Sequence, residues 1–168
     1  MAVLSDALEV RGLRSLSGSL DIETSAEDAF ALLAEVEKWP VWLSFLRSAR
    51  LVDPKRPLTV GSEIVLRSSI PGEEEQLYEV DALIGNFHLS LVGAYSVRRR
   101  IDFRIERKTS RAKVHAKVTY PAYHGRVGAW VDRLRNGRKL SAALDHSLVL
   151  FRGMVEYHRE PDACLADL

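Results

Sequence analysis

The residue types that most often bind metals or act as nucleophiles are few in this chain, and their spacing fits neither task. The five histidines are His88, His115, His124, His146 and His158. No two of them are four residues apart, which is the spacing of a helical zinc site. The single cysteine, Cys164, lies in a polar C-terminal segment. We therefore expect no metal, no cofactor and no catalytic residue of these types.

Two further catalytic patterns are missing. The chain has no Gly-x-Ser-x-Gly sequence, so it lacks the nucleophile elbow of the α/β-hydrolases. Its one closely spaced glycine pair, at residues 125–128, is too short for a P-loop and lacks the Lys-Ser/Thr ending. The sequence therefore supports neither a phosphate-binding loop nor a catalytic triad.

Arg99 is the most informative polar residue. It alternates with Ile101 and Phe103, so a regular strand would point it inward with them. A buried guanidinium needs a carboxylate from the protein or from a ligand. Alternatively, Arg99 lies near the start of the strand and extends its charged head to solvent. Both interpretations stay open.

Three hydroxyl groups also fall on apolar faces. Tyr78 and Tyr120 alternate with apolar strand residues, and Ser147 lies on the apolar stripe of the last predicted helix. Each hydroxyl could orient the carbonyl or phenol of a ligand, or could simply bind a backbone group.

Charge and composition argue against several classes of protein. The 168 residues include 24 basic and 23 acidic side chains, for a formal net charge of +1. Nucleic-acid binding needs a clustered excess of Lys and Arg. Acidic residues interrupt the basic run at residues 98–104, as on a solvated strand surface. No apolar run reaches the ~18 residues of a membrane span. We expect a single domain over residues 1–168, cytoplasmic, with no nucleic-acid partner and no stable membrane insertion.

Alternation of apolar and polar residues, typical of half-buried strands, recurs along much of the chain. One such run comes before two predicted helices, and about six follow them. Their short connections favour antiparallel pairing, because a parallel crossover needs ~12 or more residues. The predicted strands cover approximately 16–22, 49–53, 63–68, 77–84, 87–91, 97–106 and 111–120.

Two short helices are predicted after the first strand. Ser25 and Asp28 resemble a capping box at the start of an apolar run with helical spacing. Pro40 should end this helix near Trp39, because the residue before a proline avoids helical dihedral angles. A second helix is expected at about residues 41–46.

The longest predicted helix, at about residues 126–158, needs a partner surface, and the strands are the only large candidate. A bend or interruption is expected near Asn136-Gly137. A long helix across a curved antiparallel sheet is an α+β architecture, and we expect a pocket lined mainly by carbon between the two layers. The apolar stripe of the helix comprises Leu140, Leu144, Ser147, Leu148, Phe151, Val155 and His158.

Parts of the sequence resemble a known family. The run from Gly18 to Phe30 and the run Val36-Glu-Lys-Trp-Pro-Val-Trp42 look like the opening of the polyketide cyclase/dehydrase-like proteins. Val60-Gly61, Leu144-Asp-His-Ser-Leu148 and Glu156 fit the same pattern. These proteins belong to the START, or SRPBCC, superfamily, together with the birch pollen allergen. The resemblance covers about residues 16–158, and leaves 1–14 and 159–168 as poorly defined ends.

The resemblance implies a helix-grip fold: a long helix lying across a seven-stranded sheet around an apolar cavity. It also implies a choice of functions, since the superfamily includes lipid carriers, hormone receptors and aromatase/cyclases. The Rieske cysteine-histidine motif of the ring-hydroxylating oxygenases is absent. The residues expected to line the cavity are Trp42, Phe45, Tyr78, Phe87, Arg99, Phe103, Tyr120, Ser147 and Phe151.

Three functions remain open from the sequence. The first is binding, and possible transport or sequestration, of a hydrophobic or aromatic small molecule such as a lipid or polyketide-like compound. The second is an aromatase/cyclase-like enzyme that uses Arg99 and a tyrosine. The third is a protein-interaction module without a ligand, acting through the outer sheet face or through the Val149 side of the last helix. A monomer or a homodimer is expected.

Overall fold

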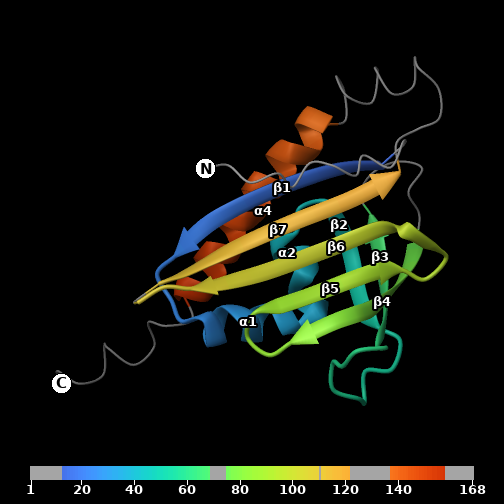
Figure 1. The fold of residues 1–168 in the computed structure, drawn as a ribbon, viewed down its shortest axis with the longest axis horizontal. Coiled ribbons are helices and arrows are strands. Elements are labelled where there is room, and N and C mark those ends of the chain that lie inside the picture. The colour runs from blue at the N-terminus through green and yellow to red at the C-terminus, as the bar shows by residue number, and fades with distance from the viewer. Residues whose placement is uncertain (1–12, 69–74, 110, 122–136, 158–168) are drawn as a thin grey trace, which may run out of the picture.

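A seven-stranded antiparallel sheet forms the body of the molecule. The computed structural model describes residues 13–68, 75–109, 111–121 and 137–157. In these segments the strand order is β1-β7-β6-β5-β4-β3-β2 (Figure 1), which confirms the predicted sheet. The strands are β1 (Leu13–Ile22), β2 (Leu46–Leu51), β3 (Glu63–Ser68), β4 (Glu75–Ile84), β5 (His88–Gly93), β6 (Ser96–Arg107) and β7 (Ala112–Pro121).

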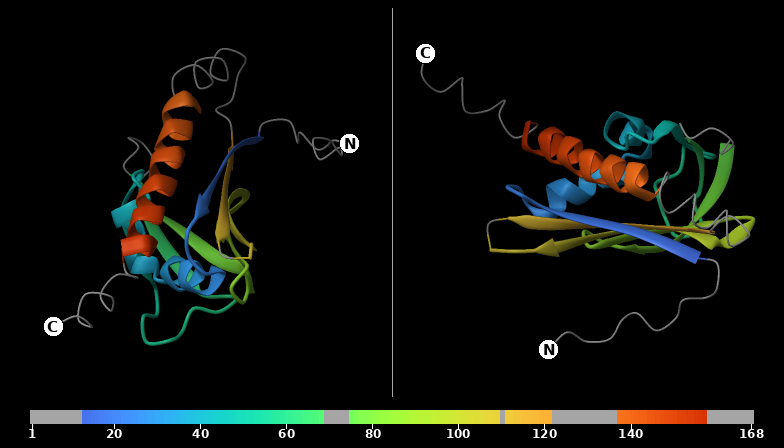
Figure 2. Two further views of the ribbon diagram at one scale, coloured as in Figure 1. Left: turned by 90° about the vertical axis from the view of Figure 1, so that its left-hand side faces the viewer. Right: turned by 90° about the horizontal axis from the view of Figure 1, so that it is seen from above.

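The helices lie together on one face of this sheet (Figure 2). They are α1 (Ala26–Ala34), the one-turn 3-10 helix η1 (Val36–Lys38), α2 (Trp39–Trp42) and the long α4 (Gly137–Tyr157). The part of the last predicted helix before residue 137 is outside the described residues. None of the helices in the described ranges has the length and apolar character required to cross a bilayer. The α+β helix-grip architecture is confirmed.

The start of α1 is set locally, as the sequence predicts. The Asp28 backbone N–H donates to the Ser25 hydroxyl oxygen at 3.0 Å, and the Ser25 hydroxyl donates to the Asp28 carboxylate at 2.6 Å. This pair supplies one of the hydrogen bonds that the first turn of a helix cannot make with its own backbone.

The prediction for Pro40 was wrong. Trp39 adopts helical dihedral angles (φ −54°, ψ −40°), and Pro40 lies inside the first turn of α2 instead of closing α1. Proline is tolerated there because the first N–H groups of a helix have no carbonyl partner to lose. The second helix therefore lies earlier than the predicted range, and Leu46 already begins β2.

A β-bulge in β4 changes which side chains face the helices. The pairing of β4 with β5 shifts between Val80 and Ala82, and a bulge exchanges the two faces of a strand beyond it. Leu83 consequently packs against the core, whereas Ile84 is 58% exposed. Strict alternation along β4 would place Ile84 on the face of Tyr78.

Helix α4 packs closely on β1. A Cβ atom at Gly18 would lie 3.0 Å from Leu148 Cδ1 and 3.2 Å from Asp145 Oδ1. Farther along, the Glu23 backbone N–H donates to Glu156 Oε1 at 3.0 Å. Glycine at position 18 thus allows the helix to approach the strand backbone.

Candidate functional site

The inner face of the sheet, which the helices cover, is closed at one end and accessible at the other. On β7, Val114 and Ala116 are buried, whereas Val118 and Tyr120 are partly exposed. The same gradient runs from Ile22 to Leu16 on β1, from Phe103 to Arg99 on β6 and from Val80 to Gln76 on β4. We call this region the open end, and define it by the inner-face residues Leu16, Gln76, Tyr78, Arg99, Val118 and Tyr120, all of which are partly exposed except Tyr78.

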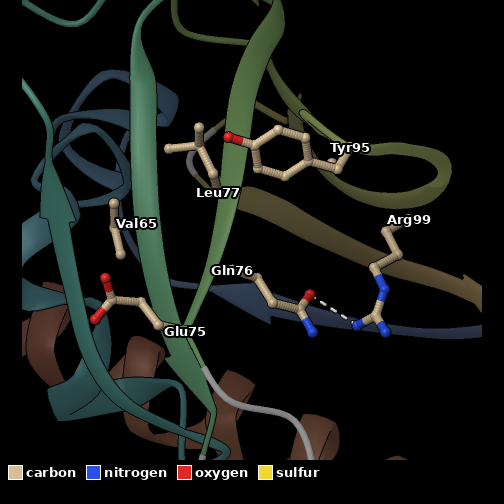
Figure 3. A pocket seen from close by; sticks show the side chains of 7 residues that line it. Val65, Glu75, Gln76, Leu77, Tyr95 and Arg99 are labelled. Atoms are coloured by element: carbon tan, nitrogen blue, oxygen red, sulfur yellow. Dashed lines mark hydrogen bonds between the residues drawn. The ribbon is translucent and has the colours of Figure 1, made fainter.

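A hydrogen-bonded polar cluster lies at the open end. Arg99 Nη1 donates to Gln76 Oε1 at 2.7 Å (Figure 3). The Tyr78 hydroxyl donates to the same oxygen at 3.3 Å. Tyr78 is buried, and its ring belongs to the core; Gln76 and Arg99 are partly exposed. The cluster therefore brings polar groups to the edge of an apolar interior, where they can orient a ligand.

The direction of the Gln76 amide follows from its partners. A guanidinium can only donate hydrogen bonds, so the amide oxygen must face Arg99. The amide nitrogen is then the group of Gln76 that takes no part in the bond to Arg99. Gln76 thus presents N–H donors that its bonds to Arg99 and Tyr78 do not use.

The strand pairing is interrupted beside this cluster. Val92 of β5 pairs with Arg100 of β6, yet the next residue, Gly93, pairs with Ser96. Residues 97–99 of β6 are therefore passed over, and the pairing of β6 with β7 begins only at Arg100. At Arg99, β6 therefore pairs with neither β5 nor β7.

A pocket of about 280 Å³ lies at the break. Val65 and Leu77 alternate with the inner-face residues of β3 and β4, so they reach the pocket from the outer face of the sheet. Gln76 and Arg99 line it as well, and thus adjoin both the pocket and the open end. The remaining lining residues are Glu75, Gly93 and Tyr95 (Figure 3).

Four of the predicted cavity residues lie toward the open end. Tyr78, Arg99 and Tyr120 belong to it, and Phe45 lies at the same end, where its carbonyl accepts a hydrogen bond from the Ser68 hydroxyl at 3.4 Å. Of the two interpretations of Arg99, the structure combines parts of both: the side chain is partly exposed, and it binds a polar neighbour.

Three other predicted residues lie in the closed part of the interior. Trp42 packs edge-to-face on Phe151, with ring centroids 4.8 Å apart, and on Phe103 at 5.8 Å. Trp39 completes this aromatic cluster, at 5.7 Å from Phe103. The four rings fill the space between α4 and the sheet at that level, since each side chain is buried to within 1%. We call these four residues the aromatic cluster.

The two indole N–H groups of the aromatic cluster differ in their hydrogen bonding. Trp39 Nε1 donates to the Leu33 carbonyl at 2.9 Å. Trp42 Nε1 is buried and has no hydrogen-bond partner within the described part of the chain. A buried donor without a partner lowers stability by about 1–3 kcal/mol.

Ser147 has a structural contact that joins α2 to α4. Its hydroxyl donates to the Ala143 carbonyl at 2.6 Å and accepts a hydrogen bond from the Ser44 backbone N–H at 3.0 Å. The side chain is fully buried. Of its two sequence interpretations, backbone bonding is the one observed.

Phe87 does not line the interior, which corrects the prediction. It lies in the β4–β5 turn after Asn86, whose φ is 62°, and it is 44% exposed. The Arg107 guanidinium lies over its ring at 5.9 Å. The turn begins beyond the bulge of β4, so the alternation that held for Leu89 does not extend back to Phe87.

Sequence reasoning overlooked two polar residues at the open end. Gln76 shares the inner face with Tyr78 and Val80 by simple alternation, so its position was readable. Arg14 lies opposite Tyr120 in the pairing of β1 with β7 and is partly buried. The first strand begins at Leu13, earlier than predicted, which is why Arg14 was left out.

The charged groups outside the open end form ordinary ion pairs. His88 Nε2 lies 3.2 Å from Asp102 Oδ1 on the outer face of the sheet. A hydrogen bond from Lys108 lowers the pKa of Asp21, which is an exposed residue of β1. In the segments that the structure describes, no group of three or more His, Cys, Asp or Glu side chains is placed to hold a metal ion.

Comparisons with known proteins find similarity in structure alone. No family model matches the sequence, and no curated protein matches it. Among solved structures, the Zhui aromatase/cyclase from Streptomyces sp. R1128 matches with a TM-score of 0.70 and 11% identity, over 90% of this chain and 98% of that one.

Two further solved structures are similar. A START superfamily protein from Mycobacterium smegmatis has a TM-score of 0.61 at 14% identity, over 86% of this chain and 98% of the other. A polyketide cyclase-like protein from Corynebacterium glutamicum has a TM-score of 0.59 at 15% identity, over 89% and 96%. At such identities the likeness is one of fold. The chain shares the fold of these START superfamily and polyketide cyclase-like proteins, the fold that the sequence resemblance implied.

Proposed function

We propose that the protein binds a hydrophobic or aromatic small molecule, such as a lipid or polyketide-like compound, at the open end of the grip. One observation carries the proposal. In the described part of the chain, the inner face of the sheet becomes partly exposed at the same end where Gln76, Tyr78 and Arg99 form a polar cluster. Apolar surface that is accessible beside a few oriented polar groups is the usual composition of a small-molecule site.

Burial of apolar surface would drive this binding, at ~25 cal/mol per Å² removed from water. Leu16, Val118 and Phe45 supply that surface, and the polar cluster would set the orientation of the ligand. The aromatic cluster already fills the deeper interior. We therefore place the ligand at the open end, above the aromatic cluster rather than within it.

A matched pair of substitutions tests this location. Val118→Asp puts a carboxylate into the open end, whereas Val149→Asp makes the same change on α4 at an exposed position. We expect the first to weaken binding of Nile red more than ~10-fold, because a buried carboxylate must lose its hydration, and the second to leave binding unchanged.

Both variants must keep the circular dichroism spectrum of the parent protein. Native mass spectrometry of protein purified from its host provides a second measurement, since a resident ligand would add mass. Failure of the parent protein to bind the dye or to carry any apolar molecule would refute the proposal, and would favour an interaction module without ligand.

An aromatase/cyclase-like activity is the second candidate, and it uses the same site. The observation that favours it is the Tyr78 hydroxyl, which is buried and shares its acceptor with Arg99. A phenol held in this way could donate a proton to a substrate carbonyl. Turnover of a poly-β-ketone analogue that is lost in Tyr78→Phe would support this activity. Binding without turnover would support only the binding function.

A further inference from the structure

We infer that the ligand site continues through the break in the sheet into the outer pocket. The ligand is then an elongated neutral molecule with an apolar group on each side of a central carbonyl or ester oxygen. This inference rests on the proposed function, and it adds the class of ligand. It follows from three features of the region beside the break in the pairing of β5 with β6.

First, the open end and the outer pocket share two side chains. Gln76 and Arg99 line the pocket, and Gln76 also accepts a hydrogen bond from Tyr78, whose ring is part of the core. Residues 97–99 of β6 are passed over in the pairing with β5, whereas the Ala94 N–H still donates to the Leu77 carbonyl of β4 at 2.9 Å. The two spaces therefore meet beyond Ala94, at Gln76 and Arg99. The bond between Arg99 and Gln76 spans the connection.

Second, the size and lining of the pocket suit one part of a ligand. Its volume of about 280 Å³ is just below the ~300–1,000 Å³ of complete small-molecule sites. Val65 and Leu77 give it an apolar floor, and Tyr95, which is 90% exposed, stands at its rim. A ring or short chain that enters would gain contacts with these three side chains.

Third, the polar groups at the connection select a neutral oxygen. The Gln76 amide nitrogen offers uncharged N–H donors, since the amide oxygen faces Arg99. The charged groups of the lining oppose each other, since Arg99 is a cation and Glu75, which also lies 3.4 Å from Arg50, is an anion. The lining therefore has no net charge that would favour an ionic group. A carbonyl or ester oxygen can accept from Gln76 without bringing a charge. The connection therefore fits the middle of an uncharged molecule.

The naphthyl ketones prodan and laurdan provide matched probes. They share one aromatic ring system and one ketone, but prodan carries a propionyl chain and laurdan a lauroyl chain. We expect laurdan to bind the parent protein more tightly. Tyr95→Ala should reduce laurdan affinity about 10-fold, which corresponds to ~50 Å² of lost apolar contact, and should leave prodan affinity unchanged. Tyr157→Ala, at an exposed tyrosine of α4, is the control and should change neither.

A second variant tests the hydrogen bond itself. Gln76→Glu keeps acceptor oxygens for Arg99 and Tyr78 but removes the amide donor, because a carboxylate only accepts. The emission of both dyes moves to longer wavelength when the ketone accepts a hydrogen bond. We expect Gln76→Glu to shift the emission of bound laurdan to shorter wavelength.

The possible outcomes separate the two proposals. If neither dye binds the parent protein, the proposed function fails. If both bind equally well and Tyr95→Ala changes neither affinity, the open end alone is the site, and the continuation into the outer pocket is wrong. If Gln76→Glu leaves the emission of bound laurdan unchanged, Gln76 does not recognise the ketone, and the assignment of the ligand class is overturned.

Discussion

Two substitutions in the aromatic cluster, Trp39→Phe and Trp42→Phe, should differ in stability although they remove the same atoms. Both side chains are buried to within 1%, so the apolar and cavity costs of the change are similar and largely cancel in the comparison. The hydrogen bonding does not cancel. Trp39→Phe leaves the Leu33 carbonyl without the indole donor that now lies at 2.9 Å, at a cost of about 1–3 kcal/mol.

Trp42→Phe has the opposite polar effect. It removes a buried N–H group that has no partner within the described segments, and so relieves a penalty of about 1–3 kcal/mol. Weak contacts of an N–H group with aromatic rings can offset part of such a penalty, and the Trp42 ring lies edge-to-face with Phe103 and Phe151. Trp39→Phe should therefore be less stable than Trp42→Phe by about 2–4 kcal/mol.

Urea unfolding measures this difference directly. Far-ultraviolet circular dichroism is the suitable signal, because each substitution changes the tryptophan fluorescence. The free energies are comparable if both variants unfold with the same m value. If Trp42→Phe destabilises the protein as much as Trp39→Phe does, the Trp42 indole has a hydrogen-bond partner in solution, and the reasoning is wrong.

Three further predictions concern the periphery of the fold. Ser25→Ala should lower the free energy of unfolding by about 1 kcal/mol in urea, through loss of the α1 cap; an unchanged midpoint would show that the cap is not needed. Gly18→Val should cost about 1–3 kcal/mol, because its Cβ meets Leu148 Cδ1 at 3.0 Å; unchanged urea stability would mean that α4 can move away. The lowered pKa of Asp21 gives a contribution to stability that is present above its unfolded pKa and is lost as the pH falls through its folded pKa. Lys108→Met should return the Asp21 pKa toward its usual range in an NMR titration, and a pKa that stays low would assign the effect to other charges.

Local patterns in the sequence predicted most of the fold. Period-two alternation located the strands because most of them have one buried and one solvated face, although β3 and β5 each contain three consecutive buried residues. The cap of α1 was readable because Ser25 and Asp28 are three residues apart and interact within one turn. The partnership of sheet and α4 followed from the apolar stripe of the helix. All of these depend on neighbours in sequence.

Features that depend on pairing between strands were not predictable in the same way. The bulge in β4 depends on the register with β5, and it reversed the expected faces of Leu83 and Ile84. The break in β6 gives no sign in the sequence, so the outer pocket beside Tyr95 was not foreseen. Alternation places Gln76 on the inner face with Tyr78, but nothing in the pattern distinguishes its amide as a ligand-binding group.

The pairing of β1 with β7 has a consequence for how the chain reaches this structure. Leu13 pairs with Pro121 and Ile22 with Ala112, so the first strand finds its partner only after the last strand has been made. Strands β2 to β7 each pair with the next in sequence, and contacts between near neighbours lose little chain entropy when they form. Folding should therefore end with the capture of β1. The first strand stays unpaired while β2 to β7 are synthesised, and the edge of β7 is open to aggregation until β1 pairs with it.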